Sequence, residues 1–515
     1  MSEVSVLGMS SKVYTCGVFG LQAMAIEVEA DVSSQLPGIF IVGLPDKAVE
    51  EARERVRSAL KNSGCEFPRT KVTVNLAPAD VKKEGSAYDL PIALALLVAS
   101  GQLHSQAGFN SRLFLGELSL EGTLRAVSGV LVVARAARRL GFSELYIPAA
   151  NATEAALVEG LTVYAPKNLT ELLNHLAGQE IIEPIAITNL DRITISDIPP
   201  DSDLSHIHGQ EHAKRALEVA AAGGHNLLMS GPPGSGKTLL ARALSGVLPP
   251  LTREEVLEVT EIYSVAGLLT SEQPLIRRRP FRSPHHTASE VALVGGGSNP
   301  RPGEISLSHR GVLFLDELPE FPRSVLESLR QPLEDGLVTV ARAAATIQYP
   351  AQFILVAAMN PCPCGYAGDP VKPCTCTPGM IYRYQHKLSG PLLDRFDLHV
   401  NVPRLPFEKL ELPSAEPSIK VQERIVVARQ RQAERFGHQV KLNATMKLTD
   451  IKNLQLPAEA VELLRQAVNK FHLSGRVYHR VLKVARTIAD LAGSVEITAS
   501  HVAEALQYRP RGQNE

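Results

Sequence analysis

The stretch Gly231–Thr238 reads GPPGSGKT and contains the residue types that can hold a nucleoside triphosphate. It fits the pattern G-x-x-x-x-G-K-[ST], and it lies between a predicted strand, Asn226–Ser230, and a helix-forming run, Leu239–Leu244. Glycines allow backbone N–H groups to surround a phosphate, and the start of the helix adds the positive end of its dipole. Lys237 is expected to reach the β- and γ-phosphates, and Thr238 to hold Mg²⁺ through its hydroxyl. A plain turn between core elements is the alternative. The predicted ATP-binding residues are Gly231, Pro232, Pro233, Gly234, Ser235, Gly236, Lys237 and Thr238.

Polar residues also follow two other apolar runs, which we predict to be buried strands. Gly311–Leu315 is followed by Asp316 and Glu317, and Phe353–Met359 is followed by Asn360. We expect Asp316 to hold Mg²⁺ through water and Glu317 to polarise the attacking water. Asn360 could orient that water without competing for the metal. Solvated turns at the strand ends are the alternative interpretation.

Four of the six cysteines occur close together in a loop rich in proline and glycine. Their spacing is C-x-C, nine residues, and C-x-C again. Four thiolates suit tetrahedral Zn²⁺, and disulfides are not expected in a reducing compartment. We predict a structural zinc site in the loop 361–377, with free or redox-active thiols as the alternative. The predicted ligands are Cys362, Cys364, Cys374 and Cys376.

A dense group of basic residues, RRRPFR and then two histidines, occupies positions 277–286. Such a group suits contact with phosphates and stacking on a base. A solvated surface or a contact between subunits fits the same residues equally well. The candidate DNA-binding residues of this group are Arg277, Arg278, Arg279 and Arg282.

The elements that must position these residues belong to a chain of 515 residues, which is too long for a single core. Basic and acidic residues nearly cancel, 53 against 54, so nucleic acid would have to bind through a local patch. No apolar run has the length of a membrane span, and the first residues lack the pattern of a secretory signal. We therefore expect a cytoplasmic protein without a membrane partner.

The pattern of apolar residues divides the chain into three predicted domains and a linker. Residues 1–178 mix strand and helix patterns, which predicts an α/β domain. Residues 179–204 lack a helical period and contain three prolines, which indicates an extended linker or a short edge strand. Residues 205–405 alternate apolar strands with helices, which is typical of a parallel sheet covered on both faces. Residues 406–515 become purely helical from about residue 418 and are predicted to form a lid.

Five further stretches carry a family resemblance: FRSPHHTAS (281–289), GEISLSHRGVLFLDELPEF (303–321), NPCPCG (360–365), SGPLLDRFDLHV (389–400) and LSGRVYHRVLKVARTIADL (473–491). Together with the phosphate loop, they resemble the AAA+ ATPases, in the branch that contains magnesium-chelatase ATPase subunits and MCM helicases. Within that branch, nearly the whole chain is similar to the magnesium-chelatase-like competence protein ComM (YifB) family. The resemblance implies a homo-hexameric ring in which an arginine of one subunit completes the ATP site of the next.

The resemblance also assigns roles to individual residues that spacing alone does not. Arg395, in LLDRFD, resembles the arginine finger, and Arg476, in SGR, resembles the lid arginine that contacts the γ-phosphate. Ile207 and Gln210 resemble the short motif beside the adenine base. A local ion pair with a neighbouring aspartate is the alternative for Arg395, and a solvated helix start is the alternative for Arg476.

The segment 336–349 reads as two short strands around Arg342. In the related helicases a hairpin at this place lines the pore of the ring, and a basic residue at its tip follows the DNA backbone. Arg342 is therefore a further candidate DNA contact. A plain surface hairpin is the alternative.

Residues 82–147 resemble the protease domain of Lon, which has a ribosomal-protein-S5-like fold. The resemblance places Ala87 at the position of the serine nucleophile, and Leu131, Val132 and Val133 at that of the lysine. Nucleophilic catalysis needs an adjacent base, and the predicted helix Val130–Leu140, which contains these three residues, has no lysine. We therefore expect an inactive, protease-like adaptor.

Three functions remain as hypotheses. The resemblance implies an ATP-dependent hexameric helicase that promotes branch migration of recombination intermediates in natural transformation, with single-stranded or branched DNA as its partner. The second is an ATPase of the magnesium-chelatase type that remodels a protein partner. The third is a ring-shaped chaperone, although no aromatic pore loop indicates a protein substrate. The candidate pore arginine and the basic group at 277–282 favour the first.

Overall fold

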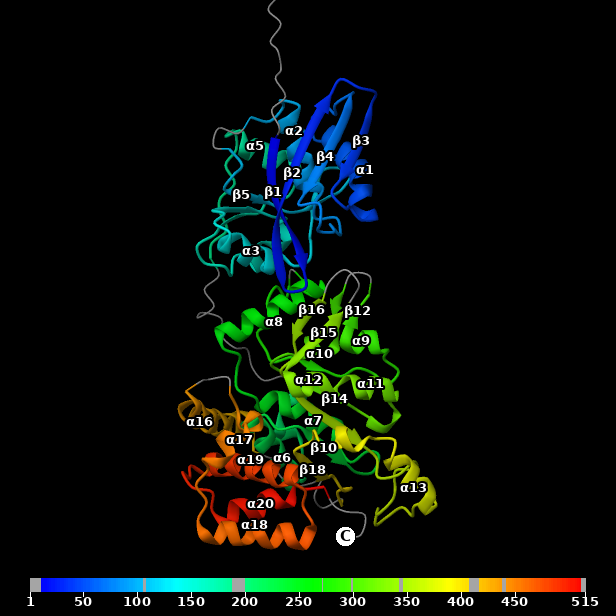
Figure 1. The fold of residues 1–515 in the computed structure, drawn as a ribbon, viewed down its shortest axis with the longest axis vertical. Coiled ribbons are helices and arrows are strands. Elements are labelled where there is room, and N and C mark those ends of the chain that lie inside the picture. The colour runs from blue at the N-terminus through cyan, green and yellow to red at the C-terminus, as the bar shows by residue number, and fades with distance from the viewer. Residues whose placement is uncertain are drawn as a thin grey trace, which may run out of the picture.

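The chain contains two large sheets with helices packed on them, followed by a group of helices at the C-terminal end (Figure 1). This arrangement confirms the predicted mixed α/β class with a parallel sheet. Among the residues that the structure describes, no helix is both long and apolar enough to cross a membrane. The computed structural model describes residues 11–104, 108–187, 200–270, 272–297, 300–341, 346–406, 416–437 and 441–510.

The N-terminal part contains a mixed sheet of seven strands in the order β3-β4-β2-β1-β5-β8-β9. Helices α1 and α2 pack on this sheet in one apolar core, and α2 is apolar on all sides because nearly all of it is buried. The strands are β1 (Ser11–Phe19), β2 (Gln22–Ser33), β3 (Gly38–Val42), β4 (Lys71–Ala77), β5 (Arg112–Phe114), β8 (Glu144–Tyr146) and β9 (Thr162–Tyr164), with a separate pair β6 (Glu117–Leu118) and β7 (Leu124–Arg125). The helices are α1 (Lys47–Asn62), α2 (Asp89–Ala99), α3 (Val130–Arg139), α4 (Ala152–Ala155) and α5 (Leu169–Leu176).

The second sheet has five strands, all parallel, in the order β11-β14-β17-β10-β18. Every residue of β14 and β17 is buried, which explains why both strands are uninterrupted apolar runs in the sequence. Parallel strands present their carboxyl ends at one edge, so the loops after β10, β14 and β17 meet there. The strands are β10 (Leu227–Ser230), β11 (Phe281–Arg282), β14 (Val312–Leu315), β17 (Ile354–Met359) and β18 (Leu398–Asn401).

Two short antiparallel pairs extend from this part of the chain: β12 (Gly295–Gly296) with β13 (Arg301–Pro302), and β15 (Leu337–Ala341) with β16 (Thr346–Pro350). The second pair is the hairpin predicted at 336–349. Its tip, which contains Arg342, lies outside the described residues. The surrounding helices are α6 (Glu211–Gly223), α7 (Lys237–Val247), α8 (Arg253–Ala266), α9 (Glu290–Val294), α10 (Glu304–Leu307), α11 (Arg323–Ser328), α12 (Arg330–Asp335), α13 (Pro378–Gln385) and α14 (Gly390–Leu393).

The C-terminal helices share one apolar core with α6, α7 and one face of the parallel sheet. A buried polar chain adds to this contact: His225, before β10, bonds Asp397 through Nδ1 at 3.0 Å and Thr487 through Nε2 at 2.8 Å. The helices are α16 (Ser418–Phe436), α17 (Leu448–Lys452), α18 (Ala458–Phe471), α19 (Gly475–Ala492) and α20 (Ala499–Gln507).

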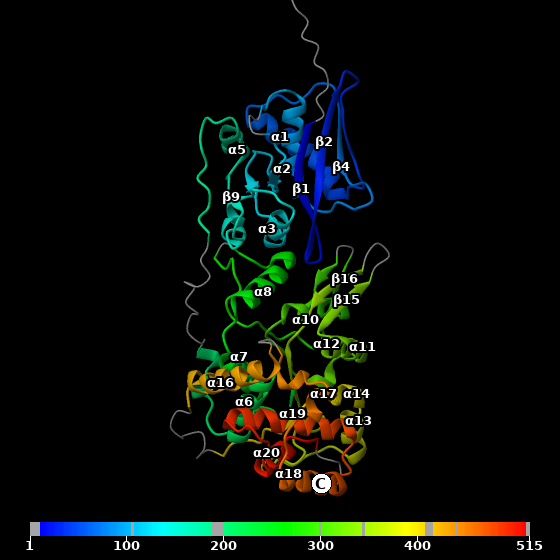
Figure 2. The same ribbon diagram turned by 60° about the vertical axis from the view of Figure 1, so that its left-hand side comes forward.

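Helix α8 packs on α3 of the N-terminal part and on α10 and β13 of the part that contains the parallel sheet. Gly129 N donates to Ser264 O at 3.0 Å, just before α3 begins. The buried carboxylate of Glu154 accepts hydrogen bonds from Leu131 N, at 2.9 Å, and from the Ser264 hydroxyl. The turn of the β1–β2 hairpin also points toward β15 and β16 in both ribbon views (Figures 1 and 2), and a Cβ on Gly20 would lie 2.4 Å from Ile347 Cγ2.

Candidate functional site

The phosphate loop lies between β10 and α7, at the carboxyl edge of the parallel sheet. Its first glycine, Gly231, is so close to the end of β18 that a Cβ atom would lie 2.1 Å from Val402 O. Gly234 and Gly236 have φ angles of 75° and 91°, and a Cβ on either would meet no atom within 4 Å. Glycine adopts positive φ at little cost, so these residues build an open turn of backbone amides that suits a phosphate group.

Lys237 is buried, and its ammonium group is held by oxygen atoms of the site itself. Nζ donates to the carbonyl oxygens of Gly231 at 2.8 Å and Pro232 at 2.9 Å, and to Asn360 Oδ1 at 3.3 Å. Burial lowers the pKa of Lys237, and two nearby carboxylates oppose that effect. A buried cation bound mainly by neutral oxygens suits an anionic ligand, because phosphate oxygens would supply the missing counter-charge.

The loop after β14 brings two carboxylates to the phosphate loop, as the sequence predicts. The Thr238 hydroxyl donates to Asp316 Oδ2 at 3.0 Å, so a hydroxyl and a carboxylate oxygen lie together as Mg²⁺ ligands require. Glu317 follows with a left-handed backbone, φ 51°, which costs a non-glycine residue about 1–2 kcal/mol. Strain of this kind concentrates at functional sites.

The motif predicted to lie beside the adenine base also borders the phosphate loop. Gln210 Nε2 donates to Pro403 O at 2.7 Å and to Ser235 O at 3.4 Å. Ile207 is buried in the core that lies beneath the loop. Gln210 therefore contacts the phosphate loop, and the role of both residues beside a base stays a prediction.

His286 is a neighbour of Glu317 that the sequence analysis grouped with the basic residues instead. Its Nδ1 lies 3.4 Å from Glu317 Oε2, and its ring lies 4.1 Å from that of His285, centroid to centroid. The proximity of His286 to Glu317 follows from the pairing of the strands that precede them. Because β11 pairs in parallel with β14, the loop that leaves β11 ends up beside the residue that follows β14.

The two arginines assigned by resemblance lie together, and their contacts are with acidic groups of the same chain. Arg395 forms an ion pair with Glu334, and Arg476 Nη1 lies 3.4 Å from Asp394 Oδ2. Burial, followed by the charge of Arg476 and two other guanidiniums, lowers the pKa of Arg395. Among the contacts of the described residues, none joins either arginine to Lys237 or its loop.

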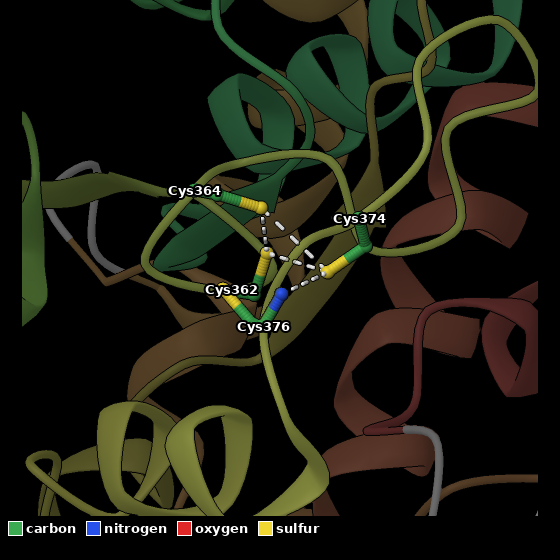
Figure 3. Close-up of side chains that lie close together, drawn as sticks. All are labelled: Cys362, Cys364, Cys374 and Cys376. Atoms are coloured by element: carbon green, nitrogen blue, oxygen red, sulfur yellow. Dashed lines mark hydrogen bonds between the residues drawn. The ribbon is translucent and has the colours of Figure 1, made fainter.

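The four predicted zinc ligands converge in the loop after β17 (Figure 3). The Sγ–Sγ distances are 3.4 Å for Cys362–Cys364, 3.7 Å for Cys362–Cys374 and 3.6 Å for Cys364–Cys374. Cys376 Sγ completes a group in which all four sulfurs lie within 4.8 Å of one another. Thiolates bound to zinc at about 2.3 Å in a tetrahedron are about 3.8 Å apart, so the group has the size that this metal requires.

Backbone N–H groups also point at these sulfurs, as expected around thiolates. Ala367 N donates to Cys362 Sγ at 3.3 Å, and Cys376 N donates to Cys374 Sγ at 3.4 Å. Such bonds stabilise a negatively charged sulfur and orient it toward a metal. The donor set and its surroundings therefore fit a zinc ion.

The four-cysteine loop packs directly on the phosphate loop. Gly365, with φ 85°, faces Pro233 so closely that a Cβ would lie 2.6 Å from Pro233 Cδ. The same Cβ would lie 3.8 Å from Cγ of Asn360, which bonds Lys237. The sequence spacing did not reveal this contact, because it joins segments more than a hundred residues apart.

Two members of the basic group at 277–282 have structural roles, which corrects the sequence interpretation. Arg279 pairs with Glu255 at 2.9 Å and donates to Arg310 O at 2.7 Å, with only 8% of its side chain exposed. Arg282 forms two hydrogen bonds of 2.6 Å with Glu304. Both guanidiniums are therefore committed to carboxylates within the domain. Arg277 and Arg278 are exposed.

Family models match the chain in three segments. "Magnesium chelatase, subunit ChlI" matches residues 203–410, "Subunit ChlI of Mg-chelatase" matches 28–151, and "Magnesium chelatase, subunit ChlI C-terminal" matches 415–509. With the parallel sheet and the phosphate loop, these matches define an AAA+ ATPase of the magnesium-chelatase type.

Comparison with curated proteins is more specific. The chain is 47% identical over 504 residues to "Competence protein ComM" of Haemophilus influenzae, covering 96% of this chain and 97% of the relative. It is 46% identical over 504 residues to "Uncharacterized protein YifB" of Escherichia coli, covering 97% of each. The "Magnesium-chelatase 67 kDa subunit" of Heliobacterium mobile is 31% identical over 186 residues, covering 31% of this chain and 28% of that protein. The chain belongs to the magnesium-chelatase-like ComM/YifB family.

Proposed function

We propose that this chain hydrolyses ATP in a hexameric ring and uses the energy to drive branch migration of DNA when incoming DNA recombines during natural transformation. The observation that carries this proposal is the similarity, over nearly the full length of both chains, to a relative named as a competence protein. The phosphate loop and the carboxylates beside it support the ATPase activity.

Within one subunit, each polar group of the site has a proposed task. Lys237 binds the phosphates, and Thr238 with Asp316 would hold Mg²⁺, which neutralises charge on the phosphates when bound. Glu317 polarises the attacking water and accepts its proton. Asn360, whose amide oxygen already bonds Lys237, orients that water.

Arg395 and Arg476 are proposed to act on the nucleotide of a neighbouring subunit. This role is supported by their position, because their described contacts are with acidic residues away from the phosphate loop of their own chain. A guanidinium placed on the transferring phosphoryl group is typically worth about 10³–10⁵ in rate. An arginine supplied by a neighbouring subunit would complete the site on oligomerisation.

Zinc is proposed as a structural cofactor of the four-cysteine loop. The metal would fix the loop that packs on Pro233 and that begins directly after Asn360. DNA contacts are proposed at Arg277, Arg278 and Arg342, and no longer at Arg279 and Arg282.

The proposal is tested by measuring ATP hydrolysis by the full chain with and without forked DNA, together with branch migration of a four-way DNA substrate. Both activities should be present in the wild type and absent in Lys237→Ala. The variants Arg395→Ala and Glu317→Gln should each be inactive alone, and their mixture should recover part of the ATPase rate. ATP hydrolysis that no DNA stimulates, together with no branch migration, would contradict the proposal.

A second candidate function is ATP-driven remodelling of a protein partner. The three family models favour it, because each describes a magnesium-chelatase subunit. The two functions differ in the macromolecule that stimulates hydrolysis. A DNA-independent ATPase that forms rings would support the remodelling function.

A further inference from the structure

The arginine proposed to act on a neighbouring subunit is paired, within its own chain, to the helix that leads into the β15–β16 hairpin. Arg395 forms an ion pair with Glu334, the penultimate residue of α12. Helix α12 ends at Asp335, Gly336 follows as its cap, and β15 begins at Leu337. Less than one helical turn therefore separates the carboxylate that holds Arg395 from the first strand of the hairpin.

The connection between α12 and the hairpin is closed by backbone hydrogen bonds. Gly336 N donates to Pro332 O at 2.9 Å, and Ala351 N donates to Gly336 O at 2.8 Å. The two strands then pair from Leu337–Pro350 to Ala341–Thr346. Since the backbone groups at this junction are engaged, a displacement of the end of α12 is transmitted to β15 and β16.

The electrostatic surroundings of Arg395 favour an exchange of partners. Three guanidiniums lie near it, those of Arg476, Arg330 and Arg480. Arg476 and Arg480 approach Asp394 at 3.4 and 3.6 Å, whereas Arg395 pairs with Glu334. The Glu334 side chain is 48% exposed, so its pair with Arg395 is accessible to a competing anion. Among the described residues, the buried Nε of Arg395 has no hydrogen-bond partner.

A nucleoside triphosphate is a stronger partner for this guanidinium than one half-exposed carboxylate. It offers several anionic oxygens, which arginine binds through two parallel N–H donors, and the surrounding guanidiniums add to the attraction. An ion pair with one half-exposed partner contributes little to stability, so little free energy opposes the exchange.

We propose that Glu334 is the resting partner of Arg395, and that transfer of Arg395 to the nucleotide of the neighbouring subunit releases the end of α12 from which the β15–β16 hairpin extends. Binding of nucleotide in one subunit thereby changes the freedom of the hairpin in the next. The inference rests on the proposed function, because it requires that Arg395 acts on a neighbour. Glu334 is a positioning residue and does not contact the reacting atoms.

The experiment compares wild type, Glu334→Gln, Glu334→Asp and a control, Glu320→Gln, all as full-length chains. Glu320 is the control because it is a similarly exposed carboxylate outside α12. It forms an ion pair with Lys387 at a distance of 3.1 Å. The first readout is amide hydrogen exchange in residues 337–341 and 346–350, with and without ADP and beryllium fluoride. The second is the stimulation of ATP hydrolysis by forked DNA.

We expect nucleotide to speed exchange of the hairpin amides at least threefold in the wild type and in Glu320→Gln. In Glu334→Gln the faster exchange should already be present without nucleotide, and DNA stimulation should fall at least threefold. Nucleotide affinity should not fall, because Glu334 no longer competes with the nucleotide for Arg395. In Glu334→Asp, hairpin exchange and DNA stimulation should lie between the values of the wild type and of Glu334→Gln. Hairpin exchange in Glu334→Gln that matches the wild type in both states would overturn the proposal. If DNA fails to stimulate the wild type, the proposed function fails, and the exchange readout still decides the role of Glu334.

Discussion

Gly365 of the four-cysteine loop lies against Pro233 of the phosphate loop, with room for no larger residue. Two different effects oppose a side chain there: the left-handed backbone, φ 85°, and the 2.6 Å approach of a Cβ to the proline ring. The same loop contains a second glycine, Gly368, with φ 77° and no atom within 4 Å of a Cβ. Substitutions at Gly365 and Gly368 share the backbone strain, but only the one at Gly365 disturbs the contact with the phosphate loop.

Gly365→Ala should therefore weaken binding of a magnesium-bound ATP analogue about tenfold, which corresponds to about 1.4 kcal/mol. Gly368→Ala shares the backbone strain, about 1–2 kcal/mol, but should leave the affinity within about twofold of the wild type. Fluorescent-nucleotide titration measures both. Equal affinities of the two variants would show that the packing on Pro233 does not shape the nucleotide site.

Removal of metal should have a similar effect on the nucleotide site. Elemental analysis of the purified chain should find one zinc per subunit, and a chelator should remove it with a fall in the unfolding temperature. Affinity for the ATP analogue should fall at the same time, because the loop that the metal holds packs on Pro233. Cys364→Ser with Cys374→Ser should reproduce both changes. A chain without bound metal, or one whose affinity survives metal removal, would contradict the structural role of zinc.

The parts of the fold and site that the sequence predicts are those encoded by local patterns. The phosphate loop, the apolar run of β14 and the carboxylates after it are each contiguous, and the parallel sheet then brings them together. Element boundaries are less accurate: the helix-forming run Leu239–Leu244 is part of a longer helix, Lys237–Val247.

The features that the sequence does not reveal are contacts between distant segments. Arg279 stands among exposed arginines in the sequence, yet its counter-ion, Glu255, comes from the first turn of α8. The pairs Arg395–Glu334 and Gly365–Pro233 likewise join segments whose proximity depends on the order of strands in the sheet. Composition cannot distinguish a buried arginine from a solvated one when their neighbours in the sequence are the same.

This distinction gives a prediction for the basic group. Arg279→Ala should destabilise the chain by about 3–5 kcal/mol, because it leaves the carboxylate of Glu255 without its main partner. Arg277→Ala should change the free energy of unfolding by less than about 0.5 kcal/mol. It should weaken binding to DNA of every sequence, and it should lower the slope of log K against log salt concentration by about one. Chemical denaturation and DNA titration at several salt concentrations measure the two effects. An unchanged salt slope in Arg277→Ala would remove this residue from the DNA contacts.

His399, on β18, makes stability depend on pH. Burial lowers its pKa from 6.5 to about 4, so the unfolded chain binds this proton more tightly than the folded chain. The contribution of neutral His399 to the free energy of unfolding is complete above pH 6.5 and is lost as the pH falls from 6.5 to 4. The loss at pH 5 is about 1–2 kcal/mol. His399→Leu should reduce the loss of stability between pH 7 and 5 by this amount, whereas the exposed His104→Gln should not. Equal pH dependence in both variants would refute the assignment.

His286 gives a prediction about catalysis, because its Nδ1 is 3.4 Å from the carboxylate of Glu317. Glu317 already has a strained backbone, and its side chain is 53% exposed, so the neighbouring imidazole restricts the positions that the carboxylate can take. His286→Ala should lower kcat for ATP hydrolysis about tenfold and leave KM nearly unchanged, since Glu317 acts in the chemical step and the phosphate-binding residues are untouched. His286→Gln, which can still donate a hydrogen bond, should recover part of the rate.

His285→Ala is the matched control, because His285 contacts the His286 ring and Thr287 but has no described contact with Glu317. A fall in KM together with kcat, or an unchanged rate in His286→Ala, would show that the imidazole does not position Glu317 for hydrolysis.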